Sequence, residues 1–116
     1  MNSLEFDYLK NNGFQSEGAD KVVAYVVKDG EIVKDGFKDA RQMAYIKARF
    51  GEDFLKYVTD MRIEVKFVGS DYDVVLEWAS VNGYGDHVTG ESFVGGEDVY
   101  DLISQAIVLA RIGTFR

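Results

Sequence analysis

The sequence predicts a single α+β domain, residues 1–116, with helices packed on one face of a mainly antiparallel sheet. Apolar and polar residues alternate along stretches of the second half, which indicates strands. Elsewhere apolar residues recur at three- and four-residue spacing, which indicates helices. The expected order of elements is α-β-β-α-β-β-β-α, and 116 residues is the length of one small domain.

Residues 1–20 are expected to form a short helix followed by a loop. Ser3 can cap the helix, and Gly13 can end it in the left-handed conformation. Residues 15–20 are polar and show no periodic pattern, so we expect a loop there.

Residues 21–37 are expected to form a β-hairpin. Asp29-Gly30, between two β-rich runs, is a dipeptide favoured in two-residue type I′ turns. Such a turn places Lys28 opposite Glu31 and continues with apolar pairs, which supports the register.

Residues 39–59 are expected to form a helix with a bend near Gly51. Asp39 and Gln42 have the spacing of a capping box at its start. The helical spacing of the apolar residues predicts one stripe that packs on the sheet. They are Met43, Ile46, Phe50, Phe54 and Tyr57.

Residues 62–94 are expected to form a three-stranded antiparallel unit. A loop over residues 69–72 would set Ile63 opposite Trp78 and Glu64 opposite Glu77, keeping apolar side chains on one face. Like charges directly opposite each other destabilise a sheet, so this Glu64–Glu77 pair would suggest a face kept acidic for a partner.

The segment VNGYGDHVTGESF, residues 81–93, contains the loop before the third strand and most of that strand. An odd-length loop over residues 82–84 keeps the faces separate and sets Trp78 opposite Val88. Glu91 would then lie across from Val75, and Asp86 would fall at the end of the Trp78 face. The opposite face would carry His87, Thr89, Glu91 and Glu77.

Residues 97–112 are expected to form the last helix, starting after Gly95-Gly96. Glu97 and Asp98 in its first turn and Arg111 near its end suit the helix dipole, and Gly113 can terminate it. Ile107, Val108 and Ile112 widen its apolar surface. A homodimer or larger assembly built on this helix is therefore an alternative function.

The charge distribution narrows the class of partner. The formal net charge is −7, and the 44 residues from Phe67 to Ala110 hold eight carboxylates and no Lys or Arg. Such a field repels nucleic acid and anionic membranes and favours basic partners. The chain has no cysteine, no apolar run long enough to span a membrane and no signal-peptide pattern, so we expect a cytoplasmic protein.

The sequence gives little evidence for a catalytic site or a metal site. His87 is the single histidine, and its neighbour Asp86 should point to the opposite face, so a small enzyme centred on His87, Glu77 and Glu91 ranks last. Asp71-x-Asp73 could bind a cation, but aspartate is common in turns for backbone reasons. We expect no cofactor and no metal.

The sequence therefore predicts a small acidic, non-enzymatic binding protein. Its acidic surface would dock onto the basic groove of another protein, and a groove lined by Lys and Arg typically holds nucleic acid. In composition the chain resembles phage-encoded anti-defence inhibitors and bacterial immunity proteins, which implies an inhibitor that acts as a nucleic-acid mimic. The predicted partner-binding residues are Asp71, Asp73, Glu77, Asp86, Glu91, Glu97 and Asp98.

Overall fold

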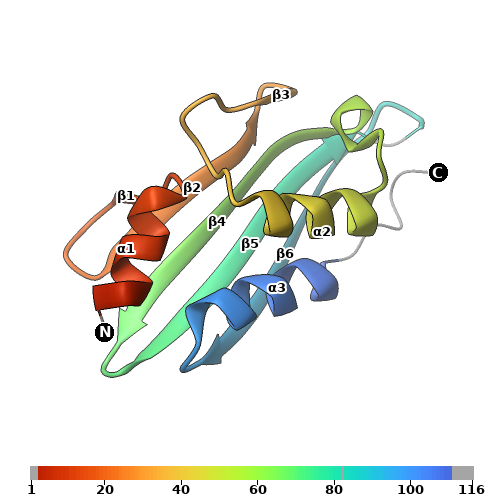
Figure 1. Ribbon diagram of the computed structural model, residues 1–116. Coiled ribbons are helices and arrows are strands. Elements are labelled where there is room, and N and C mark those ends of the chain that lie inside the picture. The colour runs from red at the N-terminus through yellow and green to blue at the C-terminus, as the bar shows by residue number, and fades with distance from the viewer. Residues whose placement is uncertain (1–2, 82, 111–116) are drawn as a thin grey trace.

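All three helices lie on one face of one antiparallel sheet (Figure 1), in a computed structural model that describes residues 3–81 and 83–110. The elements are α1 (Ser3–Asn11), β1 (Gln15–Ser16), β2 (Lys21–Lys28), β3 (Glu31–Ile32), α2 (Ala40–Phe50), the short 3₁₀ helix η1 (Phe54–Lys56), β4 (Val58–Val68), β5 (Asp71–Val81), β6 (His87–Gly96) and α3 (Val99–Leu109). The α+β class and the predicted order of the main elements are confirmed. The Cα radius of gyration, 13.8 Å, is near the roughly 13 Å of a compact chain of this length.

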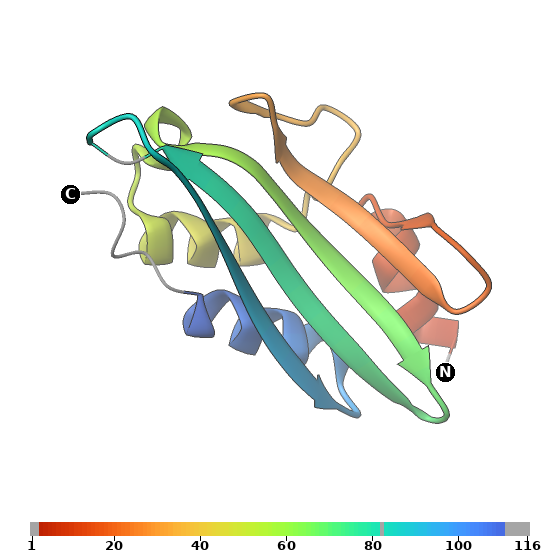
Figure 2. The ribbon, with the colours of Figure 1, turned by 180° about the vertical axis from the view of Figure 1, so that it is seen from behind.

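The sheet has the strand order β1-β2-β4-β5-β6, and β3 pairs with the far end of β2. Every neighbouring pair is antiparallel. In Figure 2 the sheet lies in front of the three helices, so its second face is open along the length of the long strands. We call this second face the open face.

The hydrophobic core lies between the sheet and the helices. Alternate residues of β4 and β5, such as Ile63 and Leu76, are fully buried against it. Ile46 on α2 and Ile103 on α3 are buried from the other side. The apolar residues that alternate along the strands and those that recur along the helices thus pack against one another in one core. The buried face of each long element can therefore be predicted from the spacing of its apolar residues.

The β2–β3 hairpin has the predicted turn and register. Asp29 and Gly30 both have positive φ, 53° and 80°, and Lys28 pairs with Glu31. The expectation of a loop over residues 15–20 is wrong at its start, because Gln15–Ser16 forms β1 and pairs with β2. Two residues are too few to show a period, so the sequence pattern gave no sign of this strand.

The predicted helix over residues 39–59 is two pieces, α2 and η1, separated at Gly51, whose φ is 93°. Asp39 caps α2 by accepting a hydrogen bond from the Gln42 backbone N–H at 2.9 Å. The capping box is incomplete, because the Gln42 side chain is buried and donates to the Tyr100 carbonyl oxygen at 3.1 Å. The expected helix end is also wrong, since β4 already begins at Val58.

The predicted β4–β5 register is wrong by two residues. A two-residue Gly69-Ser70 turn, with Gly69 at φ 62°, joins the strands, and Val68 pairs with Asp71. Glycine in the first position is typical of a type II′ hairpin turn, which twists with the strands. An even shift preserves the faces and changes every partner.

The β5–β6 register also differs from the prediction by two residues. Val81 pairs with His87, which leaves a five-residue loop of the predicted odd parity. Trp78 therefore lies opposite Gly90 instead of Val88. Asp86 lies in this loop and precedes β6, so the prediction that it falls on the Trp78 face of the sheet is wrong.

The last helix is shorter than the predicted span of 97–112. Gly95 and Gly96 still belong to β6, and Asp98 is the cap of α3, accepting a hydrogen bond from the Asp101 backbone N–H at 3.2 Å. The first helical turn thus begins after the two acidic residues that were expected within it. The roles predicted for Arg111, Ile112 and Gly113 concern positions outside the described residues.

Candidate functional site

The charges on the open face are divided between two halves of the sheet. Side chains on β2 and β4 supply the basic residues, and side chains on β5 and β6 supply acidic ones. The basic residues are Lys21, Lys28, Arg62 and Lys66, and the acidic residues that face this side from β5 and β6 are Asp71, Asp73, Glu77 and Glu91. Asp60 and Glu64 of β4 are acidic residues within the basic half. Some of the eight carboxylates of residues 67–110, which have no Lys or Arg near them in sequence, therefore lie beside basic side chains in the folded protein.

Arg62 forms the centre of an ion-pair network. Its Nε lies 3.3 Å from Glu77 Oε2, its Nη2 3.1 Å from Glu64 Oε1 and its Nη1 3.8 Å from Glu17 Oε1. Lys21 Nζ adds a contact of 3.5 Å to Glu64 Oε1. Partial burial lowers the pKa of the Arg62 guanidinium, but hydrogen bonding and attraction by Glu77 outweigh it and the pKa is raised.

The expected like-charge pair between Glu64 and Glu77 is therefore wrong. With the shifted register, Glu77 lies opposite Arg62, and Glu64 lies opposite Val75. The two-residue turn is the physical reason, because it moves each β5 residue by two positions along β4.

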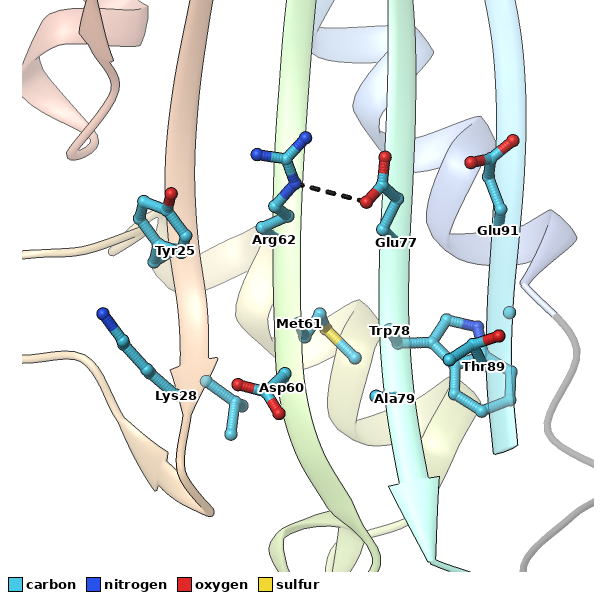
Figure 3. A pocket seen from close by; sticks show the side chains of 12 residues that line it. Tyr25, Lys28, Asp60, Met61, Arg62, Glu77, Trp78, Ala79, Thr89 and Glu91 are labelled. Atoms are coloured by element: carbon cyan, nitrogen blue, oxygen red, sulfur yellow. Dashed lines mark hydrogen bonds and ion pairs between the residues drawn. The ribbon is translucent and has the colours of Figure 1, made fainter. Parts of the chain in front are cut away.

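A like-charge pair occurs instead between β5 and β6. Glu77 and Glu91 are directly opposite each other, and Figure 3 shows both carboxylates projecting from the same face of neighbouring strands. Glu77 is bound to Arg62 on its other side, whereas Glu91 takes part in none of the ion pairs among residues 3–81 and 83–110. Glu91 is exposed, with a like charge opposite it and no ion pair among the described residues.

A shallow groove of about 580 Å³ crosses the open face near this pair. Its floor includes the small side chain of Ala79, and Tyr25, Arg62 and Glu91 border it (Figure 3). Lys28 and Asp60 close the end toward the β2–β3 hairpin. The groove carries both signs of charge and spans four strands, so it is a surface for contact and not an enclosed pocket.

The other predicted partner-binding residues lie at the ends of the sheet. Asp71 begins β5, and Asp73 lies opposite Lys66. Glu97 and Asp98 lie in the exposed connection between β6 and α3.

Asp86 lies at the opposite end, in the exposed loop before β6. Strands rise about 3.3 Å per residue, so the ten residues of β6 between them place Asp86 roughly 36 Å from Glu97. The seven residues predicted as one site therefore follow the β5–β6 half of the molecule from end to end and do not form one cluster.

His87 has little of the environment that catalysis would require. It is exposed at the start of β6, opposite Val81, and it does not line the groove. Thr89 and Glu91 share its face, as the parity predicts. Ser92 is buried on the helix side, where its Oγ donates to the Ala106 carbonyl oxygen of α3, so it is on the wrong face to act with His87.

No group of three or more His, Asp or Glu side chains in the described part of the chain is arranged to hold a metal ion. Asp71 and Asp73 share one face of β5 but have no third ligand there. Within the same residues, no helix has the length and apolar character needed to cross a bilayer.

The feature that sequence reasoning missed is the position of β6 in the sheet. Among the described residues β6 pairs with β5 alone, so it forms an edge of the sheet. The three-strand unit allowed either β4 or β6 to meet the first hairpin, and the local pattern did not distinguish them. Because β2 pairs with β4, the acidic residues of β6 and its flanks lie along a free edge.

Comparison of the chain with protein-family models, with curated proteins and with solved structures found no match.

Proposed function

We propose that this protein is a non-enzymatic binding module that docks its acidic β6 edge onto a basic surface of another protein. In the concrete form of the proposal, that surface is the nucleic-acid groove of a cytoplasmic enzyme, and the protein inhibits or modulates it as a nucleic-acid mimic. A groove that holds nucleic acid presents Lys and Arg to phosphates, and carboxylates can occupy the same positions.

The observation that carries the proposal is the unbalanced charge along β6. Glu91 lies in the middle of the strand, directly opposite Glu77, at a cost of about 0.2–1 kcal/mol to the sheet. Glu97 follows the strand, is exposed and, like Glu91, has no ion pair within the described residues. Replacing Glu91 with a neutral residue would remove repulsion, so its presence on this edge supports a role in meeting cations.

The basic half of the open face does not offset this edge. Arg62 is already bound by Glu17, Glu64 and Glu77, and it lies two strands away from β6. A basic partner that approached β6 would therefore meet mainly carboxylates.

The test compares two double variants with the same change in net charge. Glu91→Lys with Glu97→Lys reverses the edge, whereas Glu31→Lys with Glu52→Lys reverses exposed charges on β3 and after α2. Each variant is immobilised and incubated with extract at low and high salt, and captured proteins are then challenged with excess DNA or RNA. We expect basic nucleic-acid-binding proteins to be captured by wild type and by the control, to be lost from the edge variant and at high salt, and to be displaced by nucleic acid. Equal capture by both variants would contradict the proposal.

A second candidate function is assembly through α3. Val108 and Leu109 are 60% and 56% exposed, and they border a hollow of about 380 Å³ on the outer surface of α3. Adjacent exposed apolar side chains of this kind favour contact with another apolar surface. Light scattering over a range of concentrations tests it: a dimer that Leu109→Ser converts to a monomer would support assembly, and a monomer at every concentration would exclude it.

A further inference from the structure

The two edges of the sheet differ in how they are protected. At one edge, β2 is covered by the two-residue strands β1 and β3, and short edge strands limit pairing with other chains. At the other edge, β6 pairs with β5 in ten consecutive register positions without a bulge. It contains no proline, and no lysine to discourage pairing. The β6 edge is therefore long and regular enough to accept another strand.

The backbone groups that β6 presents outward can be identified from the neighbouring strands. The Val81 N–H donates to the Tyr57 carbonyl oxygen at 3.0 Å, and the Ala79 carbonyl oxygen accepts from Thr59 Oγ1, so odd-numbered residues of β5 direct their backbone groups toward β4. Backbone direction alternates along a strand, hence the even-numbered residues of β5 bond to β6. Their partners are the even-numbered residues of β6, from Val88 to Gly96.

The outward backbone groups of β6 therefore belong to its odd-numbered residues. They are His87, Thr89, Glu91, Phe93 and Gly95. The side chains of these residues lie on the open face, where Glu91 is exposed and Phe93 is 58% exposed. Val88 and Val94, with side chains toward the helices, are partly buried.

The charge of this edge selects the strand that it could accept. In an antiparallel pair of two copies, Glu91 would lie near its counterpart and Asp86 of one copy near Glu97 of the other, and like charges in such positions destabilise pairing. A strand with Lys or Arg beside Glu91 would gain attraction, and Phe93 can also hold a cation against its ring. On the other face, Val88 and Val94 favour apolar residues in the added strand.

We propose that β6 binds its partner by strand addition, accepting an extended segment that alternates basic and apolar residues. This inference rests on the proposed function and specifies how the basic partner is held. The backbone of the segment pairs with the five odd-numbered residues of β6, its basic side chains lie beside Glu91 and Phe93, and its apolar side chains lie on the helix side. Main-chain hydrogen bonds supply affinity in this mode, and the alternating side chains supply specificity.

The first test uses a peptide of alternating lysine and valine, as long as β6, and a control peptide of the same composition with the lysines and valines in separate blocks. Amide hydrogen exchange is measured with and without each peptide. We expect the alternating peptide to bind at least about tenfold more tightly, because only it matches both faces of the edge. It should slow exchange at the odd-numbered amides of β6, while the even-numbered amides, already bonded to β5, change little.

A pair of variants at Thr89 tests the backbone directly. Thr89→Pro removes a backbone N–H that points away from β5, so no hydrogen bond between β5 and β6 is lost, and an edge strand tolerates proline at such a position. Thr89→Val keeps this N–H and has a side chain of similar shape. We expect Thr89→Pro to weaken binding of the alternating peptide about tenfold and Thr89→Val to change it less than about twofold. If Thr89→Pro does not fold, the exchange pattern of the wild-type protein with the alternating peptide still tests strand addition.

The outcomes separate the two proposals. If both peptides bind equally and the odd-numbered amides show no selective protection, acidic docking stands and strand addition is overturned. If neither peptide binds at low salt, both proposals are overturned, because an acidic edge that attracts basic segments should bind at least one of the two lysine-containing peptides.

Discussion

Glu91 of β6 lies directly opposite Glu77 of β5, and only Glu77 is compensated, through its hydrogen bond from Arg62 Nε at 3.3 Å. Three strands thus carry a row of charges that runs positive, negative, negative toward the free edge (Figure 3). The last charge in the row, Glu91, has no ion pair within the described residues that would balance its repulsion from Glu77. This arrangement connects the stability of the sheet to its proposed role in binding.

Neutralising Glu91 should stabilise the protein. Glu91→Gln removes the repulsion across the β5–β6 pair, so we expect the free energy of unfolding to rise by about 0.2–1 kcal/mol. Urea denaturation at low salt measures it, and the gain should shrink at high salt because exposed charges are screened. Glu52→Gln, an exposed residue after α2, is the control and should change stability less. A loss of stability in Glu91→Gln would show that the carboxylate has a favourable contact within the fold.

Adding a side chain at Gly90 should disturb the core. A Cβ at this position would overlap the indole ring of Trp78, which lies across β6 on the helix side. We expect Gly90→Ala to cost about 1–3 kcal/mol, the range for overpacking a core. The matched control is Gly95→Ala on the same strand, where the new Cβ would meet Asp73 Oδ1 at 2.9 Å on the open face. This oxygen is at the end of a half-buried side chain, which can rotate away.

The fluorescence of Trp78 reports on the same change, because it is the single tryptophan of the chain. We expect Gly90→Ala to shift the emission and lower the urea midpoint, and Gly95→Ala to leave the emission unchanged. Equal effects of the two substitutions would mean that the indole is free to move away from β6.

Tyr8 should make the stability fall at alkaline pH. Its hydroxyl donates to Asp39 Oδ2 at 2.8 Å, and burial, followed by this bond and the charge of Asp39, raises its pKa well above the ordinary 10.0. The unfolded chain therefore loses the Tyr8 proton near pH 10 while the folded protein keeps it. Since the unfolded state then binds fewer protons, the contribution is complete below that pH and declines as pH rises above it.

The measurement compares wild type with Tyr8→Phe by urea denaturation at a series of pH values. At neutral pH the variant should lose about 1 kcal/mol with the hydrogen bond. Above pH 10 the free energy of unfolding should fall more steeply in wild type than in the variant, so that the two curves converge. Parallel curves across the alkaline range would show that Tyr8 ionises alike in both states.

Much of the candidate surface was predictable, and its geometry was not. Glu77, Thr89 and Glu91 do share the open face, because an even error in register preserves which side a residue faces. The same error gave Glu77 the wrong neighbours and hid the ion pair with Arg62. The turn at Gly69-Ser70 decided this, since a two-residue and a four-residue loop both keep apolar residues together.

By itself, the sequence determined the α+β class, the order of the main elements and the face of each long strand, because these follow from the spacing of apolar residues along a continuous segment. Only the tertiary structure decided that β2 pairs with β4, which leaves β6 at the edge, and that Glu91 meets Glu77 while Arg62 meets Glu77 from the other side. These relationships join residues far apart in the chain through backbone hydrogen bonds, which are chemically alike at every position. Local side-chain patterns therefore fix the faces, and turn geometry together with strand order fixes the partners.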